Sequence, residues 1–176
     1  MARALLVVPR RGLSVNQYRR TRQLLEEQGI QVEVAAPGGE KVVLTDFTVT
    51  PDVSLEQASV ADHDLVVFVA GRGNRELWSS SDAHRVAKDA LAAGKVIGAS
   101  GAAVGILANA HLLGGRRATG PISLAAMLRA GGADYTAEPV TVDDGIVTLR
   151  RSEAFESFGE QLLQQLRRKE ETRRAA

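Results

Sequence analysis

Short apolar runs alternate along this chain with longer segments that have a helical pattern. The clearest run is Asp64–Val69, which is continuous, rich in β-branched residues and ended by Ala70-Gly71. Leu5–Val8 and Lys95–Ala99 are similar. Such runs are typical of strands that are buried on both faces, and strands that alternate with helices form parallel sheets covered by helices. The sequence therefore predicts an α/β fold with a mainly parallel sheet.

The 176 residues are enough for one domain. Helices are expected at Val15–Gln28, Ser81–Ala93, Ala102–Leu112, Ile122–Ala130 and Phe155–Lys169. Short edge strands are expected on either side of Asp46. Val140–Leu149 contains an Asp-Gly turn signal and predicts a closing hairpin. We place the domain at residues 1–166 and a charged tail at residues 167–176.

Composition excludes several classes of function. The chain has no cysteine, so it can form neither a disulfide nor a thiolate. Its histidines, His63, His84 and His111, lack metal-binding spacing, and we expect neither a metal nor a cofactor. The formal net charge of +1 argues against a nucleic-acid or membrane-surface binder. No apolar stretch suits a signal sequence or a membrane span, which predicts a cytoplasmic protein.

Five segments resemble, in order, motifs of the ThiJ/PfpI superfamily. Asp64–Arg72 resembles its D-x-h-h-h-P-G-G-R strand and loop, and Gly94–Ala102 resembles its G-K-x-h-A-x-h-C-H-G-P elbow. Gly115–Thr119, Leu128–Tyr135 and Val140–Arg150 are similar to its later motifs. The resemblance extends from about Ala4 to about Leu163. It implies a flavodoxin-like three-layer sandwich with a C-terminal hairpin, which is usually assembled as a homodimer or a higher homo-oligomer.

The same resemblance implies a catalytic set that this chain lacks. The family's nucleophilic cysteine falls on Gly101, its neighbouring histidine on Ala102, its partner acid on Arg75 and its first-loop glutamate on Gln17. Glycine also relieves the strain of the elbow, because it has no Cβ. Two interpretations stay open: catalysis was lost with a gain in stability, or the chemistry changed. Thiol-dependent deglycation and cysteine peptidase activity are excluded in both.

Ser100 is an alternative nucleophile. Residues 98–102, Gly-Ala-Ser-Gly-Ala, resemble a G-x-S-x-G elbow with alanine for the last glycine. A serine nucleophile needs a base within hydrogen-bond reach, and no histidine is placed to supply one. We therefore favour the role of a helix cap for Ser100. Gln17 could orient a carbonyl or a water, although an amide is a poor general base.

Residues around the elbow also suggest an anionic ligand. Backbone amides in glycine-containing turns at the start of a helix can bind an anion, and arginines at the rim can bind carboxylate or phosphate through paired hydrogen bonds. These residues have other possible roles. The glycines can simply form tight turns, the arginines can be solvated, and Thr119 can pack in the core or cap a helix. The candidate ligand-binding residues are Gly71, Arg72, Arg75, Ala102, Thr119 and Arg10.

Three functions follow as candidates. The first is a cofactor-independent enzyme, a hydratase, lyase, isomerase or cyclase, which acts on a small carbonyl or carboxylate metabolite by orientation and electrostatics. The catalytic candidates are then Gln17, Ser100 and the elbow backbone at Gly101. The second is a non-catalytic protein that binds such a metabolite. The third is a chaperone-like stress protein in which the pocket is vestigial.

Overall fold

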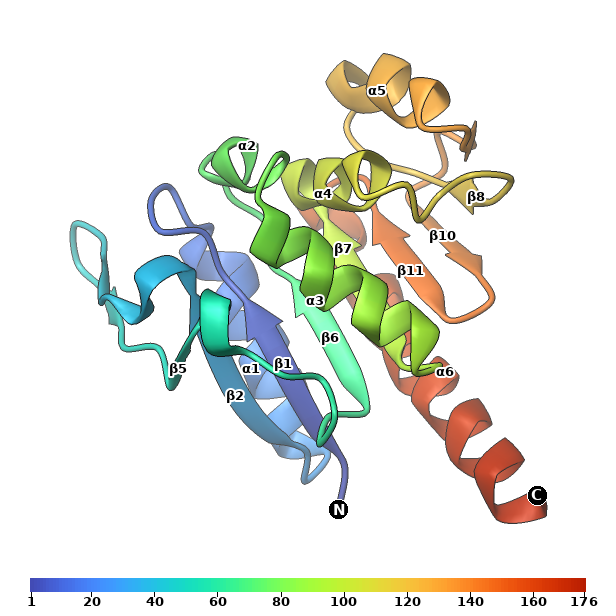
Figure 1. Ribbon diagram of the computed structural model, residues 1–176, viewed down its shortest axis with the longest axis horizontal. Coiled ribbons are helices and arrows are strands. Elements are labelled where there is room, and N and C mark those ends of the chain that lie inside the picture. The colour runs from blue at the N-terminus through green and yellow to red at the C-terminus, as the bar shows by residue number, and fades with distance from the viewer.

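The computed structural model describes Met1–Ala176 and contains a seven-stranded sheet with the order β10-β11-β7-β6-β1-β2-β5 (Figure 1). Neighbouring strands are parallel except for β10 and β11, which form an antiparallel hairpin. The strands are β1 (Arg3–Val7), β2 (Gln31–Ala36), β5 (Val53–Ser54), β6 (Leu65–Phe68), β7 (Val96–Ser100), β10 (Val140–Asp143) and β11 (Ile146–Leu149). The predicted mainly parallel sheet with a C-terminal hairpin is confirmed.

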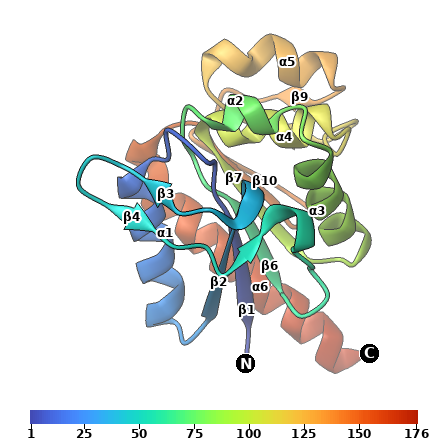
Figure 2. The same ribbon diagram turned by 60° about the vertical axis from the view of Figure 1, so that its left-hand side comes forward.

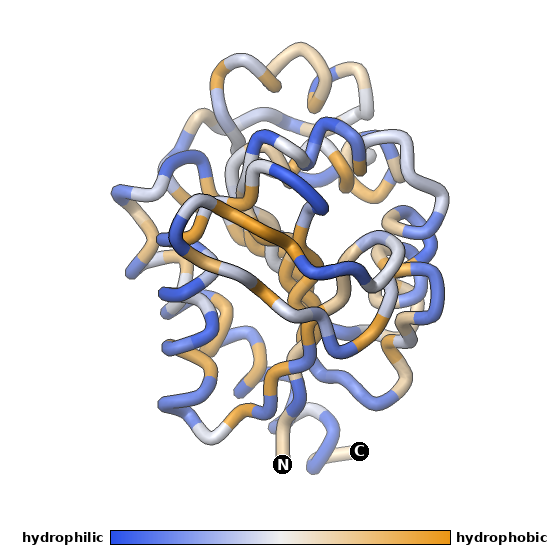
Figure 3. Tube along the Cα trace, turned by 90° about the vertical axis from the view of Figure 1, so that its left-hand side faces the viewer, coloured by the Kyte–Doolittle hydropathy of each residue, from blue (hydrophilic) through white to orange (hydrophobic).

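Helices cover both faces of this sheet. One face carries α1 (Val15–Glu27) and α6 (Phe155–Ala175), and the other carries α3 (Ser81–Ala92) and α4 (Val104–Asn109). Side chains of a strand point alternately to the two faces, so Leu5 and Leu6 of β1 belong to two different cores. The apolar segments gather at the centre of the molecule in Figure 3. The arrangement is the expected three-layer sandwich.

Short elements complete the chain. They are η1 (Pro37–Gly39), β3 (Val42–Val43), β4 (Thr48–Val49), η2 (Leu55–Gln57), α2 (Asn74–Leu77), η3 (Gly101–Ala103), β8 (Arg117–Ala118), η4 (Ile122–Leu124), α5 (Ala125–Ala130), β9 (Asp134–Tyr135) and η5 (Ser152–Ala154). The strands expected around Asp46 do not extend the main sheet. They pair with each other as the separate ribbon β3–β4, which projects beside α1 (Figure 2).

Helix α6 runs to Ala175, beyond the predicted end at Lys169. Residues 167–175 of the expected tail are therefore part of the helix. Near its end the Arg173 guanidinium lies 3.4 Å from the Asp64 carboxylate, just before β6. No helix in the chain is long and apolar enough to cross a membrane.

Candidate functional site

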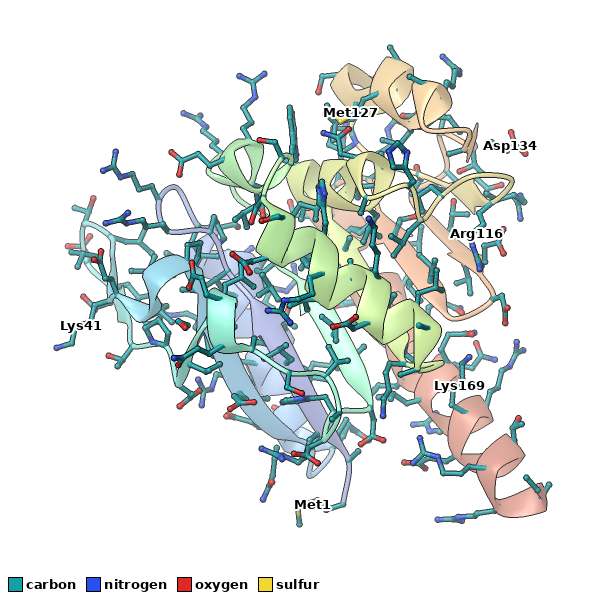
Figure 4. The ribbon with its side chains drawn as sticks, in the orientation of Figure 1. Met1, Lys41, Arg116, Met127, Asp134 and Lys169 are labelled. Atoms are coloured by element: carbon teal, nitrogen blue, oxygen red, sulfur yellow. The ribbon has the colours of Figure 1, made fainter.

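The strands β1, β6 and β7 end at the same edge of the sheet, opposite the edge where Met1 lies in Figure 4. At this edge β7 ends with Ser100, and Gly101 turns the chain into η3 with a φ of +56°. A Cβ on Gly101 would have only one heavy atom within 4 Å, the Cβ of Ala70 at 3.4 Å. The chain thus keeps a sharp strand-to-helix elbow, and glycine makes its left-handed backbone unstrained.

Ser100 is held by the neighbouring loop and is only 2% exposed. Its Oγ accepts a hydrogen bond of 3.0 Å from the backbone N–H of Ala70. No side-chain hydrogen bond caps η3, so the predicted cap at Ser100 is wrong. The reason is that its side chain turns across the sheet toward the end of β6 instead of along its own helix.

No histidine is engaged with the Ser100 hydroxyl. The Nε2 atom of His63 lies 2.6 Å from a carboxylate oxygen of Glu33, and His84 Nε2 is bonded to the carbonyl of Trp78 at 2.8 Å. His111 is exposed after the end of α4. Since a serine nucleophile requires a base in hydrogen-bond reach, this arrangement supports a structural Ser100.

Two loops meet closely beside the elbow. Gly71, after β6, forms an isolated antiparallel bridge with Leu13, before α1. A Cβ on Gly71 would lie 2.3 Å from the carbonyl oxygen of Gly12. Asn74 is fully buried, and its Nδ2 donates to the carbonyls of Val69 and Gly71 at 2.8 and 3.0 Å. Gly71 is therefore required by this close approach, whatever else its backbone binds.

Gln17 lies in the first turn of α1 and is 7% exposed. Ser14 links Gln17 to the loop after β6. The N–H of Gln17 donates to Ser14 Oγ at 3.4 Å, and the N–H of Ser14 donates to the Ala70 carbonyl at 2.9 Å. The side-chain Oε1 of Gln17 is buried and has no hydrogen-bond partner. The Oδ1 of Asn74 is likewise buried without a hydrogen-bond partner. A buried acceptor without a donor is costly, so both amide oxygens are candidates to accept a hydrogen bond from a ligand.

Trp78 covers the elbow from the other side. Its indole Nε1 donates to the Ala102 carbonyl at 2.7 Å, and a Cβ on Gly105 would lie 2.4 Å from the same nitrogen. The Trp78 carbonyl in turn accepts hydrogen bonds from His84 and from Asn109. The sequence alone did not predict that Trp78 packs on the elbow. The only residue in the sequence that points to this contact is Gly105, which leaves space for the indole.

The three predicted cationic residues do not act together as one rim. Arg10 forms an exposed ion pair with Glu40 at 2.6 Å, and the Arg75 guanidinium lies 5.5 Å from the centroid of the Trp78 ring. Arg72 is exposed, and its side chain has no hydrogen-bond or ion-pair partner. The N–H donors of Arg75 are also unpaired, so Arg72 and Arg75 both remain available to a ligand, and Arg72 makes no aromatic contact.

Thr119, the residue after β8, is fully buried. Its hydroxyl donates to the Glu138 carbonyl at 2.5 Å, and its N–H donates to the hydroxyl of Thr148 at 3.0 Å. Both polar groups are therefore paired within the protein. This supports the packing role rather than ligand binding.

Two surface hollows lie outside the elbow itself. One of about 740 Å³ separates α1 from the β3–β4 ribbon, and its walls include Tyr18, Arg22 and Phe47. There Arg22 donates a 3.0 Å hydrogen bond to the Tyr18 hydroxyl, and this bond raises the pKa of Arg22 above its ordinary value. Another, of about 440 Å³, lies beside Arg150, after β11.

The sheet order and the elbow define an α/β domain in which the elbow lies at the carboxyl ends of the strands, where ligands bind in open α/β sheets. The DJ-1/PfpI family model matches residues 2–165, and the chain belongs to this family. It is a member without cysteine.

The relatives of this chain span most of its length. It is 31% identical over 145 residues to an uncharacterized protein of Archaeoglobus fulgidus, a match that covers 82% of this chain and 86% of the other. It is 25% identical over 175 residues to an uncharacterized protein of Methanocaldococcus jannaschii, with 97% and 85% covered.

Solved structures have the same fold. A ThiJ/PfpI domain protein from Brachyspira murdochii superposes with a TM-score of 0.89 at 23% identity, over 94% of this chain and 96% of that one. Drosophila melanogaster DJ-1beta superposes with a TM-score of 0.83 at 26% identity, over 94% and 91%. The predicted family and fold are thereby confirmed.

Proposed function

We propose that this protein binds a small polar metabolite at the elbow without forming a covalent bond to it. The observation that carries the proposal is the buried, unpartnered Oε1 of Gln17 beside an elbow that has no side chain at Gly101. A Cβ at the family position of the nucleophile would thus meet only the Cβ of Ala70, at 3.4 Å. A ligand could occupy the space at that position and supply the missing hydrogen bond.

The chemistry of the surrounding groups favours a particular class of ligand. An amide oxygen accepts hydrogen bonds only, so the ligand should present a hydroxyl or an N–H to Gln17. The first N–H groups of η3, after Gly101, favour a carbonyl or carboxylate oxygen, and the free guanidinium of Arg72 favours a negative charge. We therefore expect a small hydroxy acid, or an acid that carries an amide, as the ligand.

Binding is better supported than turnover. Hydration, elimination, isomerisation or cyclisation would need a group that donates or accepts a proton, and the amide of Gln17 cannot do so. The hydroxyl of Ser100 is buried and paired with Ala70. A catalytic version of this site would have to act by orientation and electrostatic stabilisation alone.

A chaperone-like protein with a vestigial pocket is a second candidate. One contact favours it: the Trp78 indole is seated on Ala102, immediately after the elbow. In this case the surface of a homodimer or higher homo-oligomer would carry the function. Suppression of the aggregation of an unfolding client protein, together with the assembly state in solution, tests this alternative.

The fluorescence of Trp78, the single tryptophan, reports on the elbow directly. We expect a hydroxy acid from a panel of small keto acids, hydroxy acids and amides to change this fluorescence and to raise the melting temperature, because a ligand that binds only the folded state stabilises it. Gln17→Met should abolish both responses and Arg72→Ala should weaken them. Asn16→Ala, which removes an exposed amide one residue away, is the matched control.

A ligand response that survives in Gln17→Met would refute the proposed site. A response lost equally in Asn16→Ala would show that the start of α1, and not the amide of Gln17, is responsible. If no ligand in the panel gives a response while client aggregation is suppressed, the chaperone-like alternative replaces the proposal.

A further inference from the structure

A second hollow lies at the same edge of the sheet, next to the elbow. It has a volume of about 440 Å³ and is lined by Pro139, Arg150, Arg151, Glu153 and Ala154. Strand β11 lies beside β7 (Figure 1), and its last residue, Leu149, is in register with Ser100. Arg150 therefore follows β11 at the level where the elbow follows β7. We propose that this hollow binds a small oxyanion, the carboxylate or phosphate group of a metabolite, through the guanidinium groups of Arg150 and Arg151.

Arg150 is held in place and still has an unused donor. Its backbone N–H donates to the Pro139 carbonyl and its Nη1 donates to the Ala137 carbonyl, both at 2.9 Å. Its Nε is buried and has no acceptor. A buried donor of a charged group is especially costly when unpaired, and an oxyanion beside a guanidinium offers two parallel acceptors. An anion in the hollow would therefore meet a guanidinium that is already oriented, and a small movement of that group would bring its Nε within hydrogen-bond reach of the anion.

The backbone that orients Arg150 is itself unusual. Ala137 has a φ of +58°, a conformation that is uncommon for any residue with a Cβ. Residues held in such conformations are concentrated at binding and catalytic sites, where the surrounding structure imposes them. Here the strained residue supplies the carbonyl that fixes the guanidinium of Arg150. The strain thus has a specific effect, which is to position a cation.

The charge around the hollow favours an anion. No carboxylate lies within 4.0 Å of the guanidinium nitrogens of Arg150 or Arg151. Arg20 of α1 lies close by, because its Nη1 donates to the Ser152 carbonyl at 3.5 Å. Arg20 lines a separate hollow, however, together with Glu27, Glu156 and Glu160. Glu153 is the one opposing charge in the lining. It should weaken the site without neutralising either arginine.

The test is calorimetric titration with inorganic phosphate and, separately, with malonate, at an ionic strength kept constant with chloride. Arg151→Gln changes an exposed side chain and should weaken binding roughly tenfold, since hydrogen bonds to charged groups are the strong ones. Arg150→Lys keeps the charge but loses the planar fork, and we expect a similar loss. Glu153→Gln should strengthen binding. The relative affinities for phosphate and malonate identify which oxyanion the hollow prefers.

Arg174→Gln, an exposed arginine near the far end of α6, is the matched control and should leave binding unchanged. The absence of saturable binding of both anions would overturn the proposal, and so would an equal loss in Arg151→Gln and in the control. The proposal is independent of the elbow ligand: binding lost in Arg151→Gln and kept in Gln17→Met places the anion in the hollow, whereas binding kept in Arg151→Gln and lost in Gln17→Met places it at the elbow and overturns the proposal. Each of the two sites can therefore fail without the other.

Discussion

Replacing Gly101 by alanine measures the cost of a side chain at the elbow. The φ of +56° penalises any L-residue by about 1–2 kcal/mol. The added Cβ would meet only the Cβ of Ala70, at 3.4 Å, which is close to an ordinary contact and adds little. We therefore expect the free energy of unfolding to fall by about 1–2 kcal/mol. In a chain of this size, that loss lowers the melting temperature by roughly 2–8 °C.

Gly71→Ala is the matched comparison, because it adds the same methyl group in the neighbouring loop. There the Cβ would lie 2.3 Å from the carbonyl oxygen of Gly12 and 2.8 Å from the Cα of Leu13, and both atoms are backbone. Relief requires movement of a whole loop, so we expect a loss of about 3 kcal/mol or more. Urea denaturation of both variants, with unchanged m-values, gives the two free energies of unfolding.

The order of these two losses is the test. If Gly101→Ala is as damaging as Gly71→Ala, the elbow has no room for a Cβ, and the open space that we assign to a ligand does not exist. If Gly101→Ala costs nothing, the left-handed backbone is not imposed by the fold. Either result would refute the reasoning from the geometry of the elbow.

Three further substitutions test individual contacts by the same denaturation assay. Ser100→Ala should lower the free energy of unfolding by about 1–3 kcal/mol, because it leaves the buried N–H of Ala70 without an acceptor; an effect below that range would mean that water replaces the hydroxyl. Gln17→Met should raise the free energy of unfolding by about 1 kcal/mol, because the substitution removes an unpaired buried oxygen. A lower free energy of unfolding would show that the amide is paired in solution. Arg85→Ala should lower it by about 2 kcal/mol, since Arg85 donates to the carbonyls of Leu55 and Ala58; equal stability of Arg85→Ala and Arg85→Lys would contradict this reading.

The fold could be predicted because its signals are local. A run such as Leu65–Phe68 is apolar at every position, since helices cover both faces of β6. The hairpin follows from its turn: Asp144 and Gly145 both have positive φ, which suits a tight connection between β10 and β11. Both features depend only on residues that are close together in the chain, so they can be identified from the sequence.

The site could be predicted only in part, because its contacts are not local. The motif order placed Gly101 at the elbow, but the partner of Ser100 lies on another strand end, at Ala70. Trp78 reaches Ala102 only because Gly105 leaves space for the indole. Arg150 and Arg151 are adjacent, and no pattern in the sequence indicates that Arg150 is the one held by a backbone carbonyl.

The two open interpretations of the lost catalytic set make different demands on the elbow. A domain that had only gained stability should show the strain removed and the buried polar groups paired. The elbow meets the first condition at Gly101, where glycine accepts the positive φ. It does not meet the second, because the buried Oε1 of Gln17 keeps an unsatisfied hydrogen-bonding capacity, which lowers the stability of the unliganded protein. Stability alone therefore does not account for Gln17, and this residue is the observation on which the proposed ligand rests.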